Sequence, residues 1–138
     1  LFQQALQLNP GNDDLKVGLG SCYIYGQGIS GDPQETMKGI QQLLEVIRKD
    51  SNNMQAQMVL GIGAVISGQN DKAIVRLNKV VAYDPHNLEA VSWLADAYAA
   101  LGDKENAIKW YRQSKHLVNN PEFSKEVEER IKELNNTQ

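Results

Sequence analysis

Apolar residues recur along most of the chain at intervals of three and four positions, which is the spacing of one face of an α-helix. The clearest stripe, in VSWLADAYAAL, consists of Val91, Leu94, Ala95 and Tyr98. The pattern predicts about eight helices and no sheet. Their expected ranges are 1–9, 13–26, 33–49, 54–67, 71–83, 88–101, 104–118 and 121–135.

Glycine, proline and short polar residues separate these apolar stripes. Gly68 opens the sequence G-Q-N-D, and Gly102 opens G-D. We expect each glycine to end a helix in the left-handed conformation, and an Asp or Asn to cap the helix that follows. The turn Asp84-Pro85-His86-Asn87 is expected to stop one helix at the proline and to cap the next one with Asn87.

The same signals return with a fixed period. Five pairs of corresponding positions lie 34 residues apart, namely Gly68 and Gly102, Ala73 and Ala107, Leu60 and Leu94, Ala64 and Tyr98, and Asn53 and Asn87. A period of this length that contains two helical stripes indicates a repeat built from a pair of helices.

This pattern resembles the tetratricopeptide repeat family, whose repeat asks for small and bulky residues at fixed offsets. In 54–87 the offsets fall on Leu60-Gly61, Ala64, Gly68, Ala73, Leu77, Val80 and Pro85. The resemblance implies an all-α fold, a right-handed superhelix of helix pairs in a single domain. Its expected parts are 1–12 (second helix of a truncated repeat), 13–53, 54–87, 88–121 and a capping helix at 122–138.

The repeat at 13–53 carries an insertion. Tyr23 and Gly39 are 16 residues apart where the other repeats show 9, so seven residues have been added. The insertion contains GQGISG (26–31), which has the spacing of a dinucleotide-binding loop. That site requires a strand before the first glycine, whereas the repeat register makes CYIYG the end of a helix. We therefore expect a structural loop, with Gly26 or Gly28 ending one helix and Asp32 capping the next.

The last stretch, PEFSKEVEERIKELNNTQ, is predicted to close the array. Its apolar positions, Phe123, Val127, Ile131 and Leu134, lie on one helical face, and Lys, Glu and Arg occupy the other. A helix of this kind covers the apolar side of the last repeat and presents charge to water.

The resemblance also implies a concave groove lined by the first helix of each pair. Carried over residue by residue, the groove positions are Asp14, Val17, Ser21, Ile24 and Tyr25 in one repeat, Gln55, Met58, Ile62, Val65 and Ile66 in the next, and Glu89, Ser92, Asp96, Ala99 and Ala100 in the last. This groove has an apolar centre and acidic ends. In an alternative interpretation, Met58 and Val65 are core residues packed against neighbouring helices.

The carboxylate clamp by which some family members hold chaperone tails is missing. The family has Lys or Asn at the places of Val17, Ser21, Val59 and Glu89, and Arg at that of Trp93. Acidic residues in place of basic ones repel a terminal carboxylate, so chaperone C-terminal tails are not expected as partners.

Composition argues against several other functions. The net charge of −3 and the lack of a basic stripe speak against nucleic acid and anionic lipid. The longest apolar run, 58–66, is too short to span a membrane. Cys22 is the only cysteine and is expected in the core, and His86 and His116 have no partner at ligand spacing. We therefore predict no catalytic, cofactor-binding or metal-binding residues, and a protein that is not an enzyme.

The predicted function is a non-catalytic scaffold that binds a peptide or partner protein in the groove. The alternative is an assembly, self-association or biogenesis domain of a larger protein, including a cytochrome c assembly-like role in the cell envelope. The chain is expected to be a segment of a longer protein, in which the helix carrying Phe2, Ala5 and Leu6 lacks the helix that would cover it. That exposed end predicts self-association. Cytoplasmic and periplasmic locations both remain open.

Overall fold

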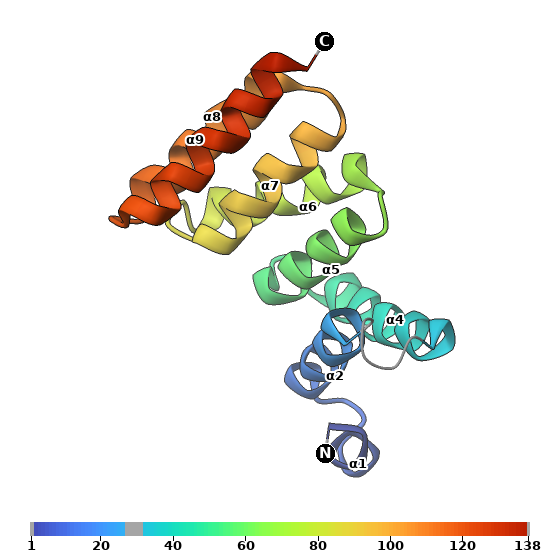
Figure 1. Ribbon diagram of the computed structural model, residues 1–138. Helices are drawn as coiled ribbons and strands as arrows, with labels where there is room; N and C mark the ends of the chain where they lie inside the picture. Colours follow the sequence, from blue (N-terminus) through green and yellow to red (C-terminus); the bar gives the residue numbers. More distant parts are fainter. Residues whose placement is uncertain (1, 27–31, 138) are drawn as a thin grey trace. The chain divides into compact units, whose positions relative to one another are not determined.

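The computed structural model describes residues 2–26 and 32–137, and every regular element in those ranges is an α-helix (Figure 1). The helices are α1 (Phe2–Leu8), α2 (Asp13–Tyr25), α4 (Pro33–Lys49), α5 (Met54–Ile66), α6 (Asn70–Tyr83), α7 (Leu88–Ala100), α8 (Lys104–Leu117) and α9 (Pro121–Asn136). Each helix end lies within one residue of the end that the apolar pattern predicts. The expected all-α fold is confirmed.

Residue contacts divide the chain into two compact units, Leu1–Gly63 and Ala64–Gln138, and the boundary falls within α5. The two units are described separately below. The sequence divides the chain further, into repeats and a capping helix. That division stays a prediction.

In the first unit α2 packs along α4, and two glycines lie at the contact. A Cβ atom on Gly20 would lie 2.5 Å from Cγ of Leu43, and one on Gly39 would lie 2.7 Å from Cβ of Tyr23. The absence of side chains at these two positions therefore sets how closely the helices approach. The buried core around the contact contains Val17, Ile24, Leu43, Val46, Ala56, Val59 and Leu60.

Two ion pairs also connect α2 and α4. Nζ of Lys16 lies 2.8 Å from a carboxylate oxygen of Glu45, and Nζ of Lys49 lies 3.1 Å from Asp13. The side chain of Lys16 is nearly buried, whereas that of Glu45 is half exposed. The hydrogen bond from Lys16 and the positive charge of Lys16 hold the pKa of Glu45 below its ordinary value.

In the second unit α7 contacts both α6 and α8, and α9 packs against α8 (Figure 1). A buried core joins α7, α8 and α9 through Ala95, Ala107, Tyr111, Val127 and Ile131. Phe123 and Leu134 pack against the edge of that core. All four apolar positions predicted for the last helix thus face the preceding helices, as a capping helix requires.

The turns follow the predicted signals with one exception. Gly68 and Gly102 both have φ of +79°, the left-handed conformation that favours glycine. Side-chain oxygens of Asn87 and Asp103 cap α7 and α8 by accepting backbone hydrogen bonds of 3.0 and 3.1 Å. The exception is α6, where an Asp or Asn cap was expected. This helix begins one residue early, so that Gln69 is its cap and makes no capping side-chain bond.

Most of GQGISG lies outside the described residues, which omit 27–31. Gly26 is described: it follows the last residue of α2, and its N–H donates a 2.9 Å hydrogen bond to the carbonyl of Cys22. The residues before the motif are therefore helical, as predicted, where a dinucleotide site needs a strand. On the other side Asp32 caps α4 by accepting a 2.9 Å hydrogen bond from the N–H of Gln34.

Candidate functional site

The predicted groove positions of the first unit divide into surface and core. Asp14, Tyr25 and Gln55 are exposed, and Ser21 and Met58 are half-buried. These five residues belong to α2 and α5, the first helices of their predicted pairs. They are the part of the predicted set in this unit that a partner can reach.

Three other predicted positions of this unit are buried. Val17 and Ile24 are 2% and 3% exposed, and both belong to the core that joins α2, α4 and α5. Ile62 is completely buried. Side chains without accessible surface do not contact a partner, so we leave these three out of the site. The register of the family places them toward the groove, but apolar packing takes them into the interior.

In the second unit, Glu89 is exposed and Val65, Ser92, Asp96 and Ala99 are half-buried, while Ile66 and Ala100 are exposed. Glu89 and Asp96 are seven residues apart on α7 and therefore lie on the same face of that helix. Asp96 has a larger role than its groove position suggested, because side chains from two further helices converge on it.

Asp96 connects three helices through its carboxylate. The hydroxyl of Tyr111 on α8 donates a 2.5 Å hydrogen bond to Oδ1 of Asp96, and Nη1 of Arg130 on α9 lies 3.1 Å from the same oxygen. Nη2 of Arg130 donates to Glu126 at 3.1 Å. Burial raises the pKa of the Tyr111 hydroxyl, and the hydrogen bond to Asp96 raises it further. Tyr111 is thus a neutral donor that holds Asp96 in place.

A surface depression of about 350 Å³ lies beside this network. We call it the α7–α9 groove; it is lined by Ala99, Tyr111, Arg130, Glu133, Leu134 and Thr137. Ala99 and Leu134 pack against the buried core of the unit and supply apolar surface. The groove therefore offers an apolar floor with charged groups at its margin, the usual composition of a binding surface.

Sequence reasoning missed the residues that α9 contributes to this groove. The signal was present: Glu126, Arg130, Glu133 and Leu134 lie 34 residues after Ser92, Asp96, Ala99 and Ala100. Because residues 122–138 were interpreted only as a solvating cap, the predicted groove positions stopped at α7 and did not include α9. In the structure α9 is both a cap, through Val127 and Ile131, and a wall of the groove.

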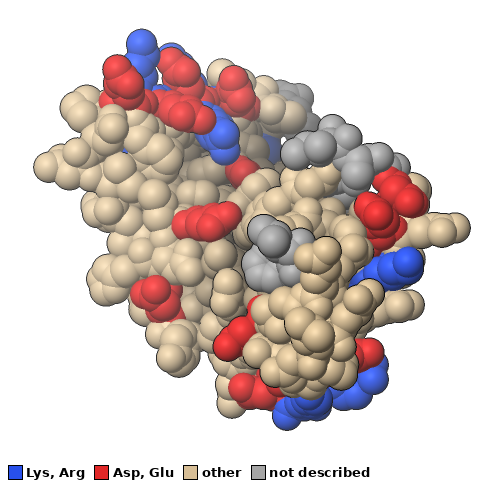
Figure 2. Space-filling view, turned by 90° about the horizontal axis from the view of Figure 1, so that it is seen from below, with Lys and Arg blue, Asp and Glu red and all other residues tan. Residues whose placement is uncertain are grey.

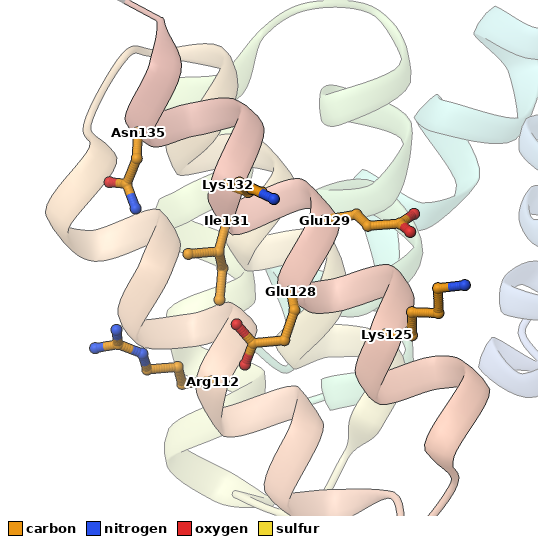
Figure 3. A pocket seen from close by; sticks show the side chains of 7 residues that line it. All are labelled: Arg112, Lys125, Glu128, Glu129, Ile131, Lys132 and Asn135. Atoms are coloured by element: carbon orange, nitrogen blue, oxygen red, sulfur yellow. The ribbon is translucent and has the colours of Figure 1, made fainter.

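A second depression, of about 420 Å³, lies on the other side of α9, where that helix meets α8. Figure 3 shows Arg112 of α8 and Glu128, Ile131 and Asn135 of α9 around it. Glu128 is paired with Lys115 of α8, and its pKa is lowered by the hydrogen bond and charge of that lysine. Charged side chains dominate this lining, and it has little apolar floor.

Two kinds of site are absent from the described residues. In ranges 2–26 and 32–137, no cluster of three or more His, Cys, Asp or Glu residues is suited to hold a metal ion. No helix among these residues is at once long and apolar enough to cross a bilayer. Cys22 is exposed, so the expectation of a core cysteine was wrong. Acidic and basic side chains form small groups separated by uncharged surface on the face that Figure 2 shows.

The family comparison and the comparison with solved structures both point to the tetratricopeptide repeat. Residues 64–124 match the family described as tetratricopeptide repeat. No curated protein sequence matches the chain significantly. Solved structures do: a crystal structure of MamA is 21% identical with a TM-score of 0.70, covering 84% of this chain and 64% of its own. A mutant of MamA is 22% identical with a TM-score of 0.76, covering 94% and 70%.

A third structure is the first tetratricopeptide domain of Spaghetti (RPAP3) bound to the HSP90 peptide SRMEEVD. It is 20% identical with a TM-score of 0.69, and the match covers 88% of this chain and 94% of that domain. Likeness at this level of identity shows the fold. The chain spans less than two thirds of the first MamA structure.

Proposed function

Because the chain is a tetratricopeptide repeat protein, we propose that it acts as a non-catalytic module that holds a segment of a partner protein. The fold is that of a protein-interaction scaffold. The observation that carries the proposal is the α7–α9 groove, in which apolar surface from Ala99 and Leu134 adjoins the ordered charges of Asp96 and Arg130. Accessible apolar surface beside fixed polar groups is what peptide recognition needs.

The first unit is proposed to carry a second contact surface. It consists of the accessible residues of the predicted set: Asp14, Ser21, Tyr25, Gln55 and Met58. Met58 suits this role because its flexible, polarisable side chain adapts to different partners. The alternative interpretation of Met58 as a core residue is tested by Met58→Glu: partner binding falls with the helical signal intact if the residue is surface, and the protein unfolds if it is core.

The partner is proposed not to be a chaperone C-terminal carboxylate. The Spaghetti domain is bound to the HSP90 peptide SRMEEVD. This chain has Glu89 exposed on α7 and Trp93 one turn later, where the family clamp has Lys and Arg. An acidic tail would meet a like charge there.

Photo-crosslinking tests where a partner sits. A photoreactive residue in place of Ser92 lies one turn before Asp96 on α7, and one in place of Lys109 on α8 is the matched control. Intact cells containing the full-length protein should give a discrete protein adduct at position 92 and none at 109. Adducts at 109 alone, or adducts that mass spectrometry identifies as nucleic acid or lipid, would contradict the proposal.

Self-association is a second candidate. On α1, Ala5 and Leu6 are half-buried and Leu8 is 88% exposed. Exposed apolar surface of this kind favours contact with another copy, in an assembly or biogenesis role. Sedimentation equilibrium should show association that Leu8→Glu abolishes. A monomer at high concentration would rule out this candidate without affecting the groove.

A further inference from the structure

The charges around the α7–α9 groove are unequally paired. Arg130 is the basic residue of its lining, and Asp96 and Glu126 both hold it. Glu133 lines the same groove and Glu89 is exposed on the Asp96 face of α7. Among the described residues, neither the Glu133 nor the Glu89 carboxylate has an ion pair or side-chain hydrogen bond. The groove therefore carries negative charge that the protein itself does not neutralise.

The opposite side of α9 has the reverse balance. The depression between α8 and α9 is lined by the basic residues Arg112, Lys125 and Lys132 and by the acidic residues Glu128 and Glu129. Lys115 beside it already neutralises Glu128. Helix α9 thus contributes both to an acidic groove and to a depression whose lining, drawn in Figure 3, has excess positive charge. Because of this asymmetry, the groove favours positively charged groups of a partner, whereas the depression between α8 and α9 does not.

The apolar and acidic features of the groove lie next to each other. Leu134 directly follows Glu133 in α9, and Ala99 of α7 lines the same depression. A partner side chain that fills the floor between Ala99 and Leu134 would place its neighbour within reach of the Glu133 carboxylate. A lysine or arginine suits that neighbour, since its cation meets an unpaired carboxylate while its stem covers apolar surface.

Deepening the proposed function, on which this inference rests, we infer that the α7–α9 groove selects a partner segment in which a lysine or arginine adjoins an apolar residue. The Glu133 carboxylate binds the positive charge of that lysine or arginine, and the Glu89 carboxylate also attracts the segment. Arg130 is already held by two carboxylates, so it does not compete for Glu133.

The test is selection from a random dodecapeptide library displayed on phage, followed by affinity measurement with synthetic copies of the enriched peptides. Glu133→Lys is the informative variant and Glu122→Lys, in the first turn of α9 and outside the groove lining, is its matched control. Lysine near the C-terminal end of a helix interacts favourably with the helix dipole, so Glu133→Lys should retain its fold, which circular dichroism checks.

Enriched peptides should carry Lys or Arg beside an apolar residue. Their affinity should fall about tenfold for Glu133→Lys, change less than twofold for Glu122→Lys, and fall as salt rises. Groove-binding peptides that are neutral or acidic, or that bind Glu133→Lys as tightly as the unmodified protein, would overturn the inference and leave the proposed function standing. A library that yields no groove-binding peptide would count against both.

Discussion

The hydroxyl of Tyr111 donates a 2.5 Å hydrogen bond to the carboxylate of Asp96, fifteen residues earlier in the chain. This contact joins α8 to α7, and Arg130 of α9 completes the junction from the other side of the carboxylate. The guanidinium of Arg130 also lies 6.0 Å from the centre of the Tyr111 ring. The groove that we propose as a binding surface is thus built on a fixed polar junction, which keeps its walls in position before a partner arrives.

Tyr111→Phe tests how much this junction contributes to stability. The variant keeps the buried ring and removes only the hydroxyl, so the free energy of unfolding should fall by about 1.5–3 kcal/mol, the usual contribution of a hydrogen bond to a charged group. Urea denaturation followed by circular dichroism measures the change. Tyr83→Phe, at a tyrosine that is 75% exposed, is the control and should be neutral. Equal midpoints for all three proteins would show that the hydroxyl does not stabilise the fold.

Gly20→Ala tests the close approach of α2 and α4. An added Cβ would lie 2.5 Å from Cγ of Leu43 and 3.0 Å from the carbonyl oxygen of Gly39, so the helices must shift. We expect a loss of about 1–3 kcal/mol from overpacking, which exceeds the gain of up to about 1 kcal/mol in helix propensity. Gly11→Ala, where a Cβ meets nothing within 4 Å, should cost little. A Gly20→Ala protein more stable than the parent would contradict the packing.

The pair of Lys16 and Glu45 predicts a loss of stability in acid. The pKa of Glu45 is lowered in the folded protein, chiefly by the hydrogen bond from Lys16, so the folded state binds fewer protons than the unfolded state near the ordinary value of 4.5. The stabilisation is present above that pH and is lost as the pH falls through the folded pKa. Thermal midpoints between pH 6 and 3 should fall more steeply for the parent than for Glu45→Gln. Parallel curves would contradict the assignment.

The helices on both sides of GQGISG predict that NAD and ATP give no saturable signal in calorimetric titration. The physical reason is that α2 is helical up to Tyr25 and α4 is helical up to Lys49, so that the strands which a dinucleotide fingerprint requires are replaced by helices. Micromolar binding that Gly28→Ala abolishes would reverse this interpretation.

Helix positions were predictable because the residues that begin or end a helix act within a few positions of themselves, whatever the rest of the fold. Gly68 and Gly102 adopt positive φ, and Asn87 and Asp103 form caps, for reasons contained within a few residues of sequence. Side-chain exposure was less predictable. Val17 and Ile24 were assigned to the groove from the family register, but burial depends on which neighbouring helices contribute apolar surface. That information is distributed over three helices and has no local signature.

The polar junction was hidden for a related reason. Asp96 was predicted as a groove residue, and only the packing of α8 and α9 brings Tyr111 and Arg130 to it. The sequence shows that Asp96 and Arg130 are separated by one repeat length of 34 residues. It does not show that α9 lies beside the groove as well as over the core, which is what brings Arg130 to Asp96.

The most direct test of the central claim is an NMR titration of the isotope-labelled protein with a bound partner segment, mapped by amide chemical shifts. The account predicts that the largest changes in the second unit fall on Asp96 and Ala99 of α7 and on Arg130, Glu133 and Leu134 of α9, with the shifts of Lys109 and Glu122 unchanged. Changes confined to the exposed face of α6 or to the α8 side of α9 would contradict it.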